Sequence, residues 1–160
     1  MDKLWAPWRK AYIWQKPEKG CFICKVKRSR EDAKHFVLKR TAHSFALLNI
    51  FPYNNGHLLI VPNRHVKGLE YLNDNELLDL LRLTSRWVQR LQKVMKPHGM
   101  NLGINLGRAA GAGVPGHMHI HVVPRWNGDT NFMPITAGTK VISESLKSVY
   151  QELKKNLSVK

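Results

Sequence analysis

The most informative stretch of the sequence reads His117-Met118-His119-Ile120-His121-Val122-Val123-Pro124-Arg125. Histidines and apolar residues alternate, which predicts a β-strand over 117–123 with all three histidines on one face. Neighbouring histidines on a strand lie about 7 Å apart, close enough for one phosphate, one metal ion or a buried hydrogen-bond relay to link them. Histidine supplies a nucleophile and proton donors near neutral pH, as the movement of a phosphoryl group requires.

A loop rich in glycine and alanine, Gly107 to Gly116, comes directly before these histidines. Such a loop lets backbone N–H groups approach an anion without obstruction by side chains. It matches neither the Walker pattern nor the dinucleotide-binding fingerprint, and glycine content alone indicates only a flexible connection. Its position before the histidines favours a role in phosphate binding.

Two apolar runs upstream, Ser44 to Ile50 and His57 to Val61, are separated by a loop that contains the turn signal Asn55-Gly56. They predict two antiparallel strands. Leucines and other apolar residues then recur at helical spacing, and they predict a helix from about Asp74 to Lys96 that ends before Pro97. Its start carries a capping-box pattern, Asn73 followed three residues later by Glu76.

The remaining elements complete the expected architecture. Asn101 to Asn105 reads as a further strand, and apolar residues from Leu146 to Leu157 predict a C-terminal amphipathic helix. The Trp-rich segment Leu4 to Trp14 reads as an arm that docks against another surface. Strands gathered around one long helix favour an α+β domain on an antiparallel sheet, with a small α/β layer as the alternative. We expect one domain over 1–160 with its core at about 21–126.

The composition limits the classes of partner that the chain is expected to bind. The 160-residue chain has 26 Lys and Arg against 11 Asp and Glu, a formal charge of +15 that favours nucleotides, nucleic acid or a phospholipid surface. The basic residues are spread along the chain, which favours a solvated surface over a dedicated nucleic-acid site. Since the chain lacks an apolar run of about 20 residues and a signal-peptide pattern, we expect a soluble cytoplasmic protein that needs no membrane.

The only cysteines, Cys21 and Cys24, are two residues apart. Two cysteines cannot supply a disulfide framework, so a metal or redox site is the more natural interpretation. A tetrahedral metal ion needs two further ligands. Free thiols and a redox pair are the alternatives, although no thioredoxin-like βαβ pattern surrounds them.

The histidine stretch resembles the signature of the histidine-triad (HIT) proteins, in which histidines alternate with apolar residues. The resemblance covers Cys21 to Arg125 and includes further matching positions in the same order: Asn49, Gly56-His57, Pro62-Asn63-Arg64-His65 and Asn105-Leu106-Gly107. Leu4-Trp5-Ala6-Pro7-Trp8-Arg9, Cys21-Phe22-Ile23-Cys24 and Pro124-Arg125-Trp126 are similar to the bacterial diadenosine-polyphosphate phosphorylase and hydrolase branch. This implies a HIT-like α+β fold with about five antiparallel strands, one long helix and a C-terminal helix.

The resemblance also implies an activity. His119 would attack the α-phosphate of an adenine nucleotide or dinucleoside polyphosphate and carry the nucleotidyl group, whereas His121 would orient it within a relay and His117 would complete the triad. The implied nucleotide-binding residues are Asn49, His57, Asn105, Gly111 and Gly113. Whether water or phosphate attacks the intermediate is left open. A nucleotide-binding module with little turnover and a nucleic-acid-end processing protein are the alternatives.

Similarity to zinc-bearing relatives, including galactose-1-phosphate uridylyltransferase, implies that His65 and His117 join the two cysteines around a structural zinc ion. The sequence departs from eukaryotic branches just before the triad, where Gly113-Val114-Pro115-Gly116 replaces a Gln or Ser that helps the leaving group. Loop N–H groups, Asn105, Arg108 or a divalent cation on the polyphosphate are the candidate replacements. The resemblance also implies a homodimer, with the long helix and adjacent strands at the interface.

Overall fold

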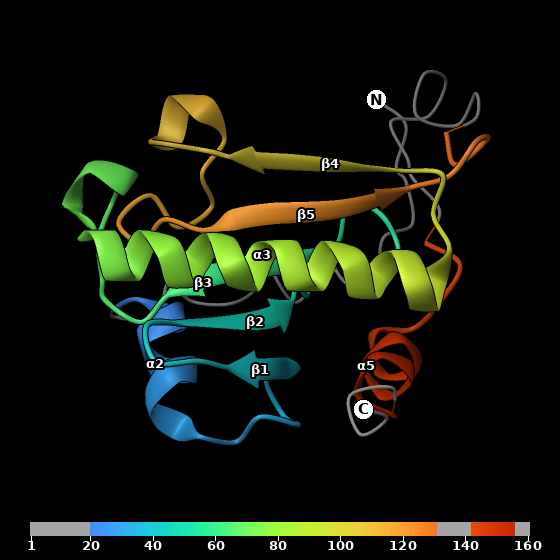
Figure 1. The fold of residues 1–160 in the computed structure, drawn as a ribbon, viewed down its shortest axis with the longest axis horizontal. Coiled ribbons are helices and arrows are strands. Elements are labelled where there is room, and N and C mark those ends of the chain that lie inside the picture. Colours follow the sequence, from blue (N-terminus) through green and yellow to red (C-terminus); the bar gives the residue numbers. More distant parts are fainter. Residues whose placement is uncertain (1–19, 131–141, 156–160) are drawn as a thin grey trace, which may run out of the picture.

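A five-stranded antiparallel sheet and helices packed on it form the fold in the computed structural model, which describes residues 20–130 and 142–155 (Figure 1). The strands are β1 (Val37–Arg40), β2 (Ser44–Leu48), β3 (Leu58–Pro62), β4 (Gly99–Ile104) and β5 (Ile120–Arg125), in the sheet order β1-β2-β3-β5-β4. The helices are α2 (Phe22–Ser29), α3 (Asp74–Met95), α5 (Leu146–Lys155) and the short 3-10 turns η1 (Leu69–Tyr71) and η2 (Arg108–Ala110). The expected α+β class and number of strands are confirmed. The Trp-rich arm and Leu157 lie outside the described residues.

Two apolar clusters cover the two faces of the sheet. The larger one joins the sheet to α3, which runs along its length in Figure 1, and includes Trp87 and Leu91 from that helix. The smaller one joins the opposite face to Ile23 and Val26 of α2. Neighbouring residues of a strand belong to different clusters because their side chains point to opposite faces of the sheet.

The long helix α3 closely follows its predicted bounds. The Asn73 side chain accepts the Glu76 backbone N–H, and the Glu76 carboxylate accepts the Asn73 backbone N–H, each at 3.0 Å, so the predicted capping box is present. Lys96 then has a left-handed backbone, with φ at 47°, and ends the helix before Pro97.

The predicted strand over 117–123 is wrong at its start, because β5 begins only at Ile120. Ile120 faces Ile60 of β3, so two residues earlier the ladder reaches Pro62, which has no N–H to donate. Met118 instead donates its N–H to the Val66 carbonyl, at 2.8 Å. His117 and His119 therefore lie on the approach to the strand, and only His121 lies within it.

Helix α2 and strand β1 were not predicted from the sequence. In α2 only Ile23 and Val26 are buried, so the apolar pattern is too short to indicate a helix. Strand β1 has four residues, and Lys39 within it is exposed. Pairing with β2 and packing of Val37 against α2 stabilise these elements.

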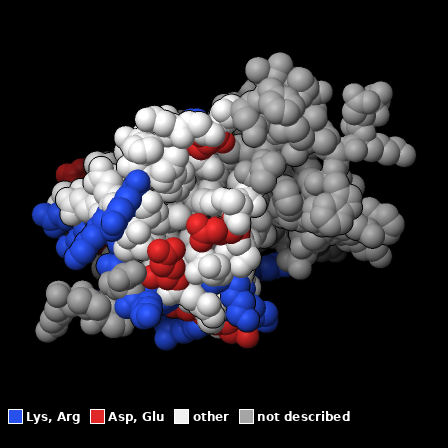
Figure 2. All heavy atoms as spheres, turned by 90° about the vertical axis from the view of Figure 1, so that its right-hand side faces the viewer, with Lys and Arg blue, Asp and Glu red and all other residues white. Residues whose placement is uncertain are grey.

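Charged side chains of both signs occur on the face shown in Figure 2, where Lys and Arg are interspersed with Asp and Glu among the coloured residues. The described part of that face therefore carries no single basic block, in keeping with the spread seen in the sequence. Within 20–130 and 142–155, no helix is long and apolar enough to cross a membrane.

Candidate active site and metal cluster

His57 and His121 form a hydrogen-bonded pair on the sheet face opposite α3. The backbone N–H of Tyr53 donates to Nδ1 of His57 at 3.0 Å, so Nδ1 is an acceptor and the imidazole proton lies on Nε2. Nε2–H of His57 then donates to Nδ1 of His121, at 2.9 Å. His121 consequently carries its own proton on Nε2. That atom is buried and has no hydrogen-bond partner among the described residues, so it remains able to donate to a ligand.

His119 lies beside this pair. Its ring centroid is 4.8 Å from that of His121, in an edge-on arrangement. Nδ1 of His119 is 3.0 Å from the His117 carbonyl oxygen, which can only accept, so Nδ1 carries the proton. The lone pair of His119 therefore lies on Nε2, the arrangement that an attacking imidazole needs.

Burial keeps the pair uncharged. Desolvation, aided by the neighbouring imidazoles, lowers the pKa of His57 to about 3, and desolvation with repulsion from His119 lowers the pKa of His121 to about 4. Both rings are neutral at physiological pH. Each ring can then donate at one nitrogen and accept at the other, as a relay requires.

The other residues predicted to bind nucleotide surround these histidines in different ways. The Asn49 amide Nδ2 is 3.3 Å from Nδ1 of His57, so this side chain helps to hold the pair. Asn105 donates to the carbonyl of Gly111, at 3.5 Å, and thereby links the end of β4 to the glycine loop. Gly111 has a φ of 85°, a conformation that favours glycine, whereas an added Cβ at Gly113 would meet nothing within 4 Å. Gly111 and Gly113 are both exposed.

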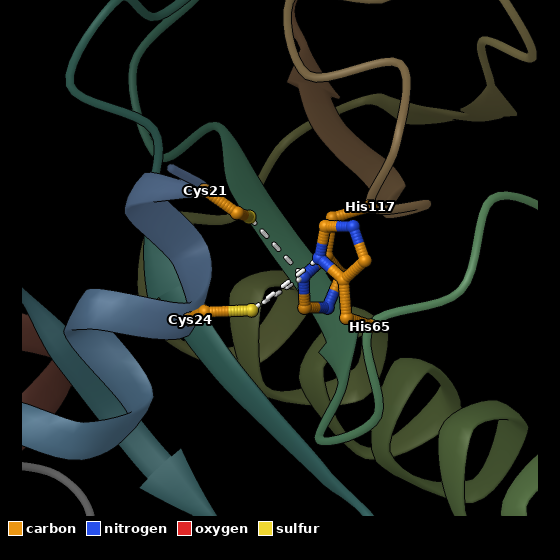
Figure 3. A group of neighbouring side chains, drawn as sticks. All are labelled: Cys21, Cys24, His65 and His117. Carbon is orange, nitrogen blue, oxygen red and sulfur yellow. Dashed lines mark hydrogen bonds between the residues drawn. The ribbon is translucent and has the colours of Figure 1, made fainter. Parts of the chain in front are cut away.

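The four predicted metal ligands come together although they are far apart in the sequence. Cys21 and Cys24 lie at the start of α2, His65 follows β3, and His117 precedes β5 (Figure 3). Their ligand atoms all lie within 4.8 Å of one another. The Sγ atoms are 3.4 Å (Cys21) and 3.5 Å (Cys24) from Nδ1 of His117, and Sγ of Cys24 is 3.4 Å from Nδ1 of His65.

The three sulfur–nitrogen separations fit one tetrahedral ion. Bond lengths of about 2.3 Å to sulfur and 2.0–2.1 Å to nitrogen place tetrahedral ligands roughly 3.4–3.8 Å apart. Nε2 of His117 donates to the Pro62 carbonyl at 2.9 Å, so Nδ1, which faces the sulfurs, has a free lone pair. Burial lowers the pKa of His117 to about 4, which keeps this ligand atom unprotonated.

His117 thus belongs to two groups at once. Its ring faces the cysteines, whereas its backbone carbonyl accepts from His119. The sequence pattern placed all three histidines on one face of one strand, but in the structure the His117 ring points toward Cys21 and Cys24. The roles of the Tyr53 N–H and the Pro62 carbonyl could not be predicted from the sequence, because backbone groups carry no residue-type signature.

A five-stranded antiparallel sheet with α3 on one face and a histidine pair on the other defines an α+β protein with a histidine site on its sheet. Residues 30–128 match the HIT domain family. The chain is 38% identical over 155 residues to the AP-4-A phosphorylase of Mycobacterium tuberculosis, which covers 92% of this chain and 80% of that protein. It is 37% identical over 120 residues to the asymmetrical bis(5'-nucleosyl)-tetraphosphatase of Schizosaccharomyces pombe, covering 75% of this chain and 58% of that protein.

Among solved structures, a Zn-bound histidine triad family protein from Mycobacterium smegmatis is similar in fold. Its TM-score is 0.70 at 24% identity, and the match covers 87% of this chain and 94% of the other. The chain belongs to the HIT family, and it is an enzyme of that family similar to the mycobacterial AP-4-A phosphorylase.

Proposed function

We propose that this enzyme transfers the nucleotidyl group of a dinucleoside polyphosphate through a covalent intermediate on His119. The observation that carries the proposal is the tautomer of His119, whose Nδ1 is bound to the His117 carbonyl so that Nε2 is the nucleophilic atom. In the first step, Nε2 of His119 bonds to the α-phosphorus, and the bond from phosphorus to the bridging oxygen breaks with its electron pair on that oxygen. Water or phosphate then displaces the histidine.

His121 is well arranged to assist either step. Its Nε2–H has no partner within the described part of the chain, and the relay from Tyr53 through His57 fixes the proton at that nitrogen. We assign this N–H to an oxygen of the reacting phosphate. The mycobacterial and yeast relatives, by their names, act on dinucleoside tetraphosphates, which supports the same substrate class here.

Incubation with diadenosine tetraphosphate, with and without inorganic phosphate, tests this function. A phosphorylase releases ADP and ATP only when phosphate is present, whereas a hydrolase releases AMP and ATP in its absence. We expect one of these product pairs. Binding without turnover under both conditions would instead indicate a nucleotide-binding module.

We further propose that Cys21, Cys24, His65 and His117 hold a zinc ion. The separations described above and the unprotonated Nδ1 of His117 support it, as does the zinc named for the mycobacterial structural relative. Four protein ligands complete a tetrahedron, so the ion would be structural and would fix α2 to the sheet. A divalent cation on the polyphosphate would be a separate, substrate-borne ion.

The proposed homodimer uses the β4 edge of the sheet. Strand β4 is one of the two edge strands, and Leu102 on it is 55% exposed. Leu78 and Leu81 of α3 are also exposed. An edge strand with exposed apolar side chains is a natural pairing surface. We expect sedimentation to show a dimer that Leu102→Glu dissociates, and a wild-type monomer at micromolar concentration would contradict this assembly.

A further inference from the structure

A pocket lies on the histidine face of the sheet, beyond His121. Its volume is about 230 Å³, and its described lining consists of Tyr53, Asn54, Asn101, Val123, Arg125 and Thr130. None of their side chains takes part in the relay, the hydrogen-bonded chain from the Tyr53 backbone N–H through His57 to His121. Nothing in the function proposed above uses the pocket.

The strand register places this pocket in line with the reacting histidines. Val123 and Arg125 follow His121 at intervals of two residues on β5, so their side chains lie on the same face, and Asn101 of β4 pairs with Val123. At about 3.3 Å per residue, Val123 is about 7 Å and Arg125 about 13 Å along β5 from His121, whose ring lies next to that of His119. A chain of several phosphates that starts at His119 and passes His121 can span that interval.

Tyr53 forms a wall between the relay and the pocket. Its ring stacks on His121, with centroids 5.5 Å apart and an interplanar angle of 16°, and it also contacts His57, at 4.6 Å. The side chain is nevertheless 53% exposed, so part of the aromatic surface remains available to a ligand. Aromatic side chains of this kind stack nucleobases.

The guanidinium of Arg125 forms another part of the lining. Its Nε and Nη2 donate to the two carboxylate oxygens of Asp129, at 2.7 and 2.8 Å, and Nη1 donates to Oδ1 of Asn101 at 2.9 Å. These bonds fix the flat group and neutralise its charge, which disfavours a phosphate as its ligand. A fixed guanidinium still offers its planar face for stacking on a ring. The Asn101 amide N–H adds a polar donor for a base edge.

We propose that this pocket binds the departing nucleoside of a dinucleoside polyphosphate, a proposal that rests on the function proposed above. The nucleotide attacked by His119 remains at the relay, and the polyphosphate chain extends along β5 to the second base beside Tyr53. The subsite accepts a neutral planar base, and the negative charge stays with the phosphates. It therefore distinguishes substrates with two nucleosides from those with one.

Binding to the full chain carrying His119→Ala tests the subsite without turnover. Titration calorimetry compares diadenosine tetraphosphate with adenosine 5′-tetraphosphate, which lacks the second nucleoside. Stacking of one base predicts a preference of about tenfold or more for the dinucleotide. Added Asn101→Ala or Tyr53→Leu should reduce this preference to about onefold to threefold, whereas Tyr53→Phe should retain it. Asn75→Ala and Tyr71→Leu, exposed residues outside the pocket, are the matched controls.

The same comparison is made in active protein, with His119 intact, as the ratio of kcat/KM for the two substrates. This ratio can be measured even for a variant whose affinity is too low for calorimetry. Equal affinities in the parent protein, or a preference that survives both Asn101→Ala and Tyr53→Leu, would overturn the subsite while leaving dinucleotide turnover intact. Absence of dinucleotide binding and turnover in the wild-type protein would overturn the proposed function together with the subsite.

Discussion

Nε2 of His57 lies 2.9 Å from Nδ1 of His121, and this contact sets the proton position on both rings. His57 can donate there only because the Tyr53 backbone N–H occupies its other nitrogen. The Tyr53 backbone N–H, four residues before His57, therefore determines that the proton of His121 lies on Nε2. A substitution at His57 should slow the chemical step because it frees the His121 proton to move to the other nitrogen.

His57→Gln removes the ring that bonds to His121 and leaves its tautomer free. We expect kcat to fall about 10²-fold, a typical contribution of a positioned proton donor, while KM changes little. Steady-state kinetics with diadenosine tetraphosphate measures both constants. His43→Gln, at an exposed histidine, is the control. A loss confined to KM would show that His57 binds substrate and does not orient His121.

His119→Ala should reduce turnover by more than about 10⁴-fold, because the nucleophile is lost, while nucleotide binding is largely retained. His119 is only 5% exposed, so circular dichroism and a melting curve are needed to show that the variant folds. His98→Ala provides the matched control. Turnover near the wild-type rate would eliminate His119 as the nucleophile.

The covalent intermediate can be detected directly. Quenching during turnover without acid, followed by mass spectrometry, should find AMP on His119, since a phosphoramidate is labile in acid. Two displacements at phosphorus also predict overall retention of configuration for a chiral α-thiophosphate substrate. Inversion without an adduct in a single turnover would instead indicate direct attack by water with His119 as general base.

The stability of the fold should depend on pH through the buried relay. Folding lowers the pKa of His57 to about 3 from an ordinary value of 6.5, so between these values the unfolded chain binds more protons than the folded one. The free energy of unfolding therefore rises with pH across this window. As the pH falls from 7 to 5, His57 therefore lowers the free energy of unfolding by roughly 2 kcal/mol.

Urea denaturation at pH 5 and pH 7 checks this dependence, with His57→Gln compared against His43→Gln. The His57 variant should show a smaller change in unfolding free energy between the two pH values. An identical change in both variants would mean that His57 does not supply the pH dependence.

Metal analysis of protein purified without chelators should find about one zinc ion per chain. The double variant Cys21→Ser with Cys24→Ser should lose it and unfold more easily, because a closed four-ligand site contributes to folding more than to the chemical step. His35→Ala with His98→Ala should keep the metal. Zinc that persists in the double cysteine variant would place the ion elsewhere.

The main architecture of this protein can be predicted from its amino-acid sequence. The periodicity of α3, its Asn73 and Glu76 cap and the alternating pattern around His121 are local features, and local features are readable from residue order. The family resemblance added the Cys21, Cys24, His65 and His117 set, which the structure brings within 4.8 Å. The spacing of two cysteines alone could not have named their partners.

Tertiary structure decided what each histidine does within that architecture. The strand pattern treated His117, His119 and His121 as equivalent, but Pro62 ends the ladder before it reaches the first two. His117 then turns toward the cysteines, and its carbonyl orients His119. The proton on His121 depends on the Tyr53 N–H, a backbone group brought there by the turn before β3. Backbone donors and acceptors are the same in every residue type except proline, so their placement appears only once the chain is folded.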